Sequence, residues 1–260
     1  MSQEIKERFK RYVAPTYGRF PITLDRGEGA YVWDSEGKRY LDLGGGIAVN
    51  CLGHANPEIN KAIAEQSSKL MHCTNFYHFE GQAILAENLA KRIGSGRVFF
   101  CNSGTESSEV MIKLARRFGQ AEGRFEMITA ENSFHGRTMA GISATGQAKV
   151  KEGFSPLLQG FVHVAHNDIA AVRSAITPAT VAVMIEGIQG EGGIHPASKE
   201  YLLGLRALCD EHNLLLLWDG VQCGHFRTGS FQSFQAILGD QIGGFMPDAV
   251  SMAKALGGGF

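Results

Sequence analysis

The chain has 260 residues, enough for one large α/β domain or for one domain with a small appendage. The formal net charge is −1 and 20% of the residues are charged, so nothing indicates a nucleic-acid or anionic-membrane partner. The longest strictly apolar runs have five residues, whereas a membrane helix needs roughly 20.

The amino terminus and the cysteines favour the cytoplasm. The first eight residues are polar and mixed in charge, unlike a secretory signal. The five cysteines include no Cys-x-x-Cys pair and their number is odd, which favours free thiols in a reducing compartment. His163 and His166 lie three residues apart, but no second ligand pair accompanies them, so we expect no metal site.

The first 56 residues are predicted to form an N-terminal segment with a β-hairpin. Residues 30–33 and 38–41 have strand-like composition and flank a turn. Residues 57–260 are predicted to form one large domain of alternating helices and strands. Its first two helices are expected over 57–70 and 81–93, where apolar residues recur at helical spacing.

Short apolar runs between the helices predict a sheet. The runs cover residues 97–101, 126–128, 161–164, 181–185 and 214–218. Continuous apolar strands are buried on both faces, which is typical of a mainly parallel sheet wrapped by helices. Residues 231–245 look loop-like and are expected to leave the domain as an excursion. In open α/β sheets ligands bind beyond the carboxyl ends of the strands, so we expect the chemistry there.

A first polar motif, residues 102–106, follows the run 97–101 and precedes an amphipathic helix. Ser103 and Thr105 can both cap a helix, and Gly104 lets a ligand approach the backbone. Free N–H groups at a helix start favour an anion such as phosphate. The alternative interpretation is a helix cap without a ligand.

A second motif, residues 133–138, follows the predicted strand at 126–128. Phe134 can stack on a flat ring, and Arg137 can bind a carboxylate. The alternative is a core phenylalanine beside a surface arginine.

A third motif, residues 186–193, contains two carboxylates, one amide and four glycines. This composition packs poorly but suits an active-site loop, and the alternative is a flexible turn. A dinucleotide site is disfavoured because no helix with glycine-rich phasing follows at once.

Two further residues are unusual where they stand. Asp219 comes directly after a buried strand, where an acid is costly unless it has a function or a cationic partner. Lys254 lies among small apolar residues before three glycines, unlike a surface lysine. Desolvation, or conversion to an imine, would make its amine a nucleophile.

In chain order the motifs supply a phosphate cradle, a ring-stacking aromatic, an acid for a ring nitrogen, an amide at Gln222 and a reactive lysine. These are the parts that a pyridoxal-phosphate site requires. The chain resembles the class III (ornithine-type) pyridoxal-phosphate-dependent aminotransferases, and most closely their acetylornithine branch. The resemblance covers almost the whole chain and also rests on residues 15–17, 27–29, 53–57 and 254–259.

The resemblance implies a role for each site residue. Lys254 would carry the cofactor as a Schiff base and move the substrate proton, and Asp219 would keep the ring nitrogen protonated. Pyridoxal 5'-phosphate would be bound by Ser103, Gly104, Thr105, Phe134, Asp219, Val221, Gln222 and Lys254. The substrate would be bound by Arg137, Glu191, Tyr17 and Tyr77.

The resemblance further implies the large cofactor-binding domain of the fold type I aminotransferases, with the C-terminal small domain absent from this chain. It implies a cytoplasmic homodimer that moves the amino group of N-acetylornithine, or a similar ω-amino compound, to 2-oxoglutarate. Open alternatives are an ornithine, GABA or lysine aminotransferase, an aminomutase or racemase on the same site, and an inactive truncated remnant.

The sequence departs from the family pattern in two places. Gly220 stands where the usual Asp-Glu-Val-Gln motif has glutamate, and we expect altered local packing there, with Asp219 and Gln222 retained. The spacer from Asp219 to Lys254 is longer than usual, with extra residues near 236–245.

Overall fold

The computed structural model describes residues 2–260, which form two compact units. The N-terminal unit comprises the residues up to Phe79 together with Gly257–Phe260, and the second unit comprises Glu80–Leu256. The predicted division after residue 56 therefore falls inside the N-terminal unit. No helix in the described part of the chain is long and apolar enough to cross a membrane.

The N-terminal unit contains a three-stranded antiparallel sheet in the order β1-β2-β3. The predicted hairpin is confirmed, because β2 pairs with β3 and Asp34 Oδ1 accepts hydrogen bonds from the backbone of Glu36 and Lys38 in the turn. The elements are α1 (Ser2–Tyr12), β1 (Leu24–Glu28), β2 (Tyr31–Asp34), β3 (Arg39–Leu41), α2 (Gly45–Ala48) and α3 (Pro57–Lys69).

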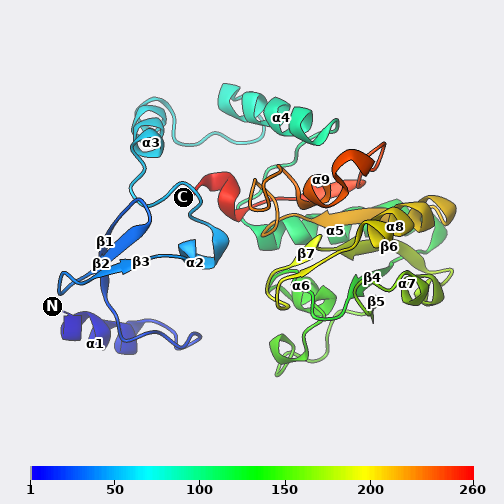
Figure 1. Cartoon of the computed structure of the whole chain (residues 1–260), viewed down its shortest axis with the longest axis horizontal. Helices are drawn as coiled ribbons and strands as arrows, with labels where there is room; N and C mark the ends of the chain where they lie inside the picture. Colours follow the sequence, from blue (N-terminus) through cyan, green and yellow to red (C-terminus); the bar gives the residue numbers. More distant parts are fainter. Residues whose placement is uncertain (1) are drawn as a thin grey trace. The chain divides into compact units, whose positions relative to one another are not determined.

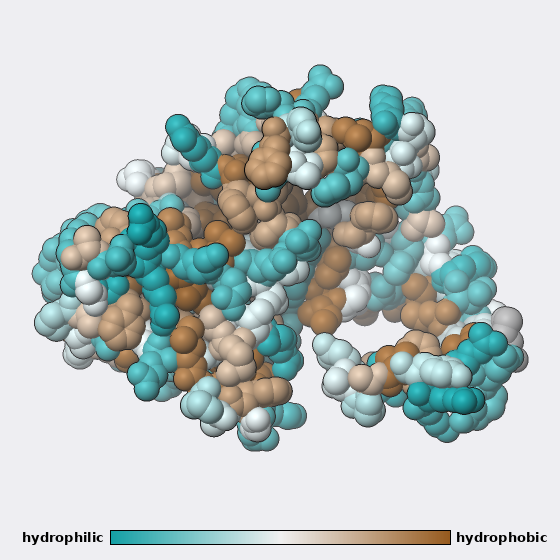
Figure 2. Space-filling model, turned by 180° about the vertical axis from the view of Figure 1, so that it is seen from behind, coloured by the Kyte–Doolittle hydropathy of each residue, from teal (hydrophilic) through white to brown (hydrophobic). Residues whose placement is uncertain are grey.

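Few side chains of this unit are buried. Val32 is the one buried residue among the described residues 2–79. Large apolar side chains are instead exposed, including Phe20, Leu43, Met71 and Phe76. On the face drawn in Figure 2, apolar (brown) atoms lie at the surface among polar (teal) ones.

The second unit is built on a five-stranded sheet in the order β10-β9-β6-β4-β5. Every neighbouring pair in this sheet is parallel, which confirms the predicted mainly parallel sheet. A separate antiparallel pair, β7 and β8, follows β6. The strands are β4 (Glu126–Ala130), β5 (Phe161–Val164), β6 (Thr180–Ile185), β7 (Ile188–Gln189), β8 (His195–Pro196), β9 (Leu215–Asp219) and β10 (Ala249–Ser251).

Helices cover both faces of this sheet (Figure 1). Successive strand residues alternate between two apolar clusters, as the pleat requires. Leu217 packs in the cluster with α5 and α6, whereas Leu216 and Trp218 pack in the cluster with α7, α8 and α9. The helices are α4 (Glu80–Ile93), α5 (Gly104–Gly119), α6 (Met139–Ala144), α7 (Ile169–Ala175), α8 (Lys199–Glu211) and α9 (Ser233–Leu238).

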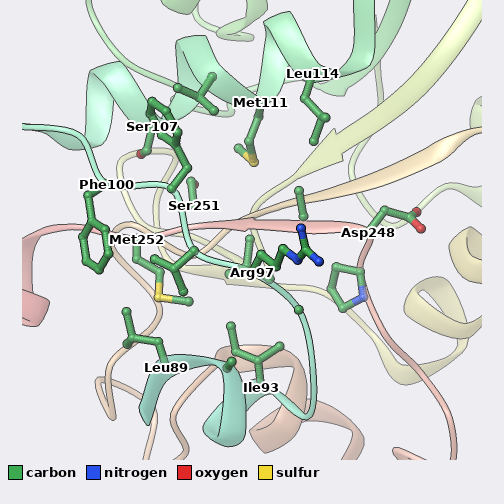
Figure 3. Close-up of a pocket in the computed structure, with 18 of the residues that line it drawn as sticks. Leu89, Ile93, Arg97, Phe100, Ser107, Met111, Leu114, Asp248, Ser251 and Met252 are labelled. Carbon is green, nitrogen blue, oxygen red and sulfur yellow. The ribbon is translucent and has the colours of Figure 1, made fainter. Parts of the chain in front are cut away.

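The predicted strand over residues 97–101 is wrong. The segment forms no strand in the described structure and lines a largely apolar cavity of about 370 Å³. Figure 3 shows Arg97 and Phe100 at this cavity together with Leu89 and Ile93 of α4 and Met111 of α5. The segment is apolar enough for a buried strand, but composition does not decide whether a neighbouring strand lies within hydrogen-bonding reach.

The predicted excursion over residues 231–245 is also wrong. Phe234, Leu238 and Phe245 are almost fully buried in the cluster with α8. The ring of Phe234 packs edge-on against Trp218, with 5.2 Å between centroids. The glycines and polar residues of this segment led to the prediction of a loop, although its apolar residues pack on one face of the sheet.

Candidate active site

The predicted site residues of the second unit gather at one edge of the parallel sheet. Asp219 ends β9, Glu186 follows β6, and Lys254 comes three residues after β10. The motif 133–138 follows β4. Because β10, β9, β6 and β4 are consecutive neighbours, their carboxyl ends bring these four segments side by side, as expected for an open α/β sheet.

The first motif forms the start of α5. Ser103 caps the helix, since its side chain accepts a hydrogen bond of 3.1 Å from Glu106 N. A Cβ atom on Gly104 would lie 2.9 Å from Val221 Cγ1 and 3.2 Å from Ala253 Cβ. The start of α5 therefore packs against the turn after Asp219 and the residue before Lys254.

Thr105 links the first motif to the second. A Cβ atom on Gly136 would lie 3.2 Å from Thr105 Oγ1. This close approach requires glycine, whose φ of 118° is also one that L side chains rarely adopt. The Thr105 hydroxyl thus faces the motif that carries Phe134 and Arg137.

Asp219 is buried and has several hydrogen-bond donors. Its Oδ1 accepts from Ser251 Oγ at 3.1 Å and from Val221 N at 3.2 Å, and its Oδ2 is 2.8 Å from His135 Nδ1. Burial lowers the pKa of His135, but the hydrogen bond and charge of Asp219, helped by Glu186, outweigh this, so the pKa is raised. His135 is therefore the hydrogen-bonded partner of the Asp219 carboxylate, and its raised pKa favours the cationic form of the imidazole.

Glu186 is a second buried acid at this edge. Its Oε2 accepts a hydrogen bond of 3.0 Å from Phe134 N, which fixes the backbone beside the predicted ring-stacking side chain. Burial raises the pKa of Glu186 to about 7, and the charge of Asp219 adds to that effect against the opposing influence of His135. The raised pKa means that a larger fraction of this carboxyl is protonated at a given pH than in an exposed glutamate.

Lys254 is half-buried and stands in a left-handed backbone conformation, with φ of 49°. Burial lowers the pKa of its amine, although the charges of Glu191, Asp219 and Glu186 act in the opposite direction. A lowered pKa increases the fraction of neutral, nucleophilic amine at a given pH.

Gln222 and Glu191 meet across two loops. Gln222 Nε2 donates a hydrogen bond of 2.9 Å to Glu191 Oε1. The loop after β6 and the turn after β9 are therefore joined at the residues predicted to bind cofactor and substrate. This contact pairs a predicted cofactor ligand with a predicted substrate ligand.

The other predicted substrate contacts are placed less firmly. Arg137 is exposed, and its guanidinium carbon lies 5.3 Å from the centre of the Phe134 ring. Tyr17 and Tyr77 belong to the N-terminal unit, where both are exposed. Their roles stay predictions.

Sequence reasoning missed His135, Glu186 and Ser251. His135 stands directly beside Phe134 in the second motif, and Asp219 was expected to have either a function or a cationic partner. These two observations together could have identified His135 as the partner of Asp219. Ser251 pairs with Asp219 across parallel strands, and no pattern along the chain announces such a neighbour.

The family model for Aminotransferase class-III matches residues 12–260. The chain belongs to the class III aminotransferases. It is 50% identical over 254 residues to the acetylornithine aminotransferase of Clostridium acetobutylicum, covering 96% of this chain and 64% of the relative. It is 48% identical over 256 residues to that of Myxococcus xanthus, covering 97% and 62%. This class III chain thus spans less than two thirds of the length of these relatives.

Solved structures agree with this assignment. The N-acetylornithine aminotransferase from Stenotrophomonas maltophilia K279a has a TM-score of 0.78 and 37% identity, covering 97% of this chain and 62% of that one. The ornithine aminotransferase from Toxoplasma gondii ME49 has a TM-score of 0.90 and 27% identity, covering 99% and 61%. The taurine:2-oxoglutarate aminotransferase from Bifidobacterium kashiwanohense, solved with PLP and glutamate, has a TM-score of 0.85 and 27% identity, covering 98% and 62%.

Proposed function

We propose that this chain carries the cofactor site of a pyridoxal-phosphate-dependent aminotransferase, with Lys254 as the residue that binds the cofactor covalently. One observation carries the proposal: the half-buried Lys254, the buried Asp219 and the start of α5 lie together at one edge of the sheet. The names of the relatives support the same activity.

The residues present fit the cofactor. The start of α5 offers N–H groups for a phosphate, and Gly104 lets this helix start pack closely against Val221 and Ala253. Asp219 already has three hydrogen-bond donors, but a carboxylate has about four lone-pair positions and can accept one more, from a protonated ring nitrogen. Gln222 lies in the turn after Asp219, where its Nε2 donates to Glu191 Oε1 and its Oε1 packs against Gly190.

When bound, pyridoxal phosphate supplies an electron sink for the substrate's Cα electrons. Each residue of this chain has a separate task beside it. Asp219 would hold a proton on the ring nitrogen, His135 would orient the Asp219 carboxylate, and Phe134 would stack on the ring. The Lys254 amine would hold the cofactor covalently and would take up and return the substrate proton. Ser103, Thr105 and Val221 complete the cofactor contacts.

For the substrates we propose N-acetylornithine, or a similar ω-amino compound, as amino donor and 2-oxoglutarate as acceptor. The names of the two curated relatives support this donor class. Arg137 would bind a carboxylate, because a guanidinium offers paired donors that match it. Glu191 would adjust the charge of the site between the two half-reactions.

We also propose a cytoplasmic homodimer. The N-terminal unit exposes large apolar side chains, among them Phe20, Leu43, Met71 and Phe76, which an interface with a second copy would cover. Light scattering that gives the mass of a single chain for the full-length enzyme would contradict this assembly.

The test of the covalent link uses borohydride. Protein incubated with pyridoxal phosphate and then reduced should carry the label on Lys254, as read by peptide mapping. Lys254→Ala should abolish both the label and the near-visible absorbance of the linked cofactor. Lys151→Ala is the matched control, since burial also lowers the pKa of Lys151. A label on Lys151, or on any other lysine, would overturn the assignment.

The test of the reaction class uses the acceptor. In a full-length enzyme, amino transfer from N-acetylornithine should require 2-oxoglutarate and produce glutamate. Turnover of the amine without an oxo acid would instead indicate a racemase or mutase on the same site.

A further inference from the structure

The turn after β9 holds two residues that the proposed function requires, Asp219 and Gln222. Its backbone is fixed by Gly220 N, which donates to Ser251 O at 3.1 Å, and by Gly224 N, which donates to Gly220 O at 3.1 Å. Gly220 is also the position at which the sequence departs from the family pattern. The side chain that packs beside Gly220 therefore affects the conformation of the turn that carries Asp219 and Gln222.

That space is filled by Gln232, the residue before α9 (labelled in Figure 1). Gln232 has 0% exposure. A Cβ atom on Gly220 would lie 2.3 Å from Gln232 Oε1, and one on Gly224 would lie 2.8 Å from the same oxygen and 2.9 Å from Nε2. A side chain at residue 220 and the amide of Gln232 therefore exclude each other.

The amide of Gln232 is buried, and its nitrogen has no hydrogen-bond partner among the described residues, while its side chain faces the Gln235 backbone in the capping box of α9. An unpaired buried amide costs free energy that an apolar side chain of the same length would avoid. Its neighbour Ser233 donates to Cys223 Sγ at 3.0 Å, and the Ser233 Oγ lies 2.5 Å from where a Cβ of Gly187 would stand. Gln232 thus packs against the turn after β9, and Ser233 packs against the loop after β6.

We propose that Gln232 is a positioning residue for the cofactor site: its amide replaces a side chain at residue 220 and holds Asp219 and Gln222 in place. The positioning role of Gln232 rests on the proposed function. The steric conflict between Gln232 and a side chain at residue 220 does not depend on that function. The two parts are therefore tested by separate measurements on the full chain.

The exclusion is tested by a double-mutant cycle on the thermal melting of cofactor-free protein. Gly220→Ala should lower the melting temperature by several degrees, because the new methyl group meets Gln232 Oε1. Gly220→Ala combined with Gln232→Ala should regain most of that loss. Gly243→Ala is the control, since nothing lies within 4 Å of a Cβ there. Additive effects of the two substitutions would overturn the pairing.

The positioning is tested by Gln232→Met, which keeps the length of the side chain and removes the amide. We expect the cofactor-free protein to melt at nearly the same temperature, while the Kd for pyridoxal phosphate rises roughly tenfold, because the flexible methionine chain packs less rigidly than the planar amide against Gly220 and Gly224. The band of bound cofactor should also shift its pH dependence, because Asp219 is less well placed. Gln241→Met, at an exposed position, should change neither quantity.

Two results would overturn the positioning role. An unchanged Kd in Gln232→Met would show that the side chain only fills space, and a lowered melting temperature with a proportional loss of binding would show a merely structural role. If the wild-type chain does not bind pyridoxal phosphate, the proposed function fails and the positioning role fails with it. The melting cycle still decides the exclusion between residues 220 and 232.

Discussion

The two units of the chain each contain an aspartate–histidine pair with the same 2.8 Å separation, and the pairs differ mainly in their surroundings. In the N-terminal unit, the Asp42 and His54 side chains are 21% and 29% exposed. In the second unit, the Asp219 and His135 side chains are 5% and 0% exposed. Water screens the first pair, whereas the second depends on its own hydrogen bonds.

This contrast extends to the whole of each unit. The second unit buries two apolar clusters on the faces of a parallel sheet, and the described N-terminal unit buries little beyond Val32. Chemistry that relies on shifted pKa values needs a dry, rigid setting. The comparison therefore explains why the candidate site residues with displaced pKa values lie in the second unit.

The largest expected effect comes from breaking the buried pair. His135→Ala should destabilise the protein by about 3–5 kcal/mol, because Asp219 keeps a buried charge without its cationic partner. His54→Ala should cost about 0–1 kcal/mol, as exposed pairs do. Urea unfolding of both variants provides the comparison. Equal losses would show that burial does not distinguish the pairs.

The next effect concerns apolar packing. Leu202→Ala should cost about 2–5 kcal/mol, since this side chain has 0% exposure in the core of the second unit. Leu43→Ala, at 88% exposure in the N-terminal unit, should stay within about 0.5 kcal/mol. The same unfolding assay measures both variants. A large loss at Leu43 would mean that this surface is covered in solution.

The smallest effect is the pH dependence of the two pairs. The pKa of His135 is raised above its ordinary value of 6.5, so its stabilisation is complete below that value and is lost as pH rises through the folded pKa. The hydrogen bond from His54 lowers the pKa of Asp42 below 3.8, so that stabilisation is present above 3.8 and is lost as pH falls through the folded pKa.

Melting temperatures followed against pH separate the two effects. His135→Ala should flatten the decline above pH 6.5, and Asp42→Asn should flatten the decline below pH 3.8. A wild-type profile that rises above pH 6.5 would contradict the raised pKa of His135.

The sequence predicted the features that depend on order along the chain. The parallel sheet followed from uninterrupted apolar runs, and the site was placed at the carboxyl ends of its strands because Asp219 directly follows such a run. The start of α5 was predicted from Ser103 and the polar residues around it. Each of these patterns is local.

The errors concern relations between distant segments. Residues 97–101 have strand composition, but a strand exists only where a neighbour completes the ladder, and that neighbour is not specified locally. Residues 231–245 resemble a loop, although Phe234 and Phe245 close the core beside Trp218. Likewise, the space that Gln232 fills beside Gly220 is determined by folding and not by spacing.

The left-handed backbone conformation at Lys254 is unfavourable for folding, whereas the proposed chemistry requires a lysine there. An L residue in that conformation costs about 1–2 kcal/mol, which glycine or asparagine would largely avoid. Selection for stability alone would therefore drive this position away from lysine. A lineage that no longer needed the amine would be expected to lose it early, before the surrounding core changed. The proposed role of the Lys254 amine supplies a reason to keep lysine at this position against that conformational cost.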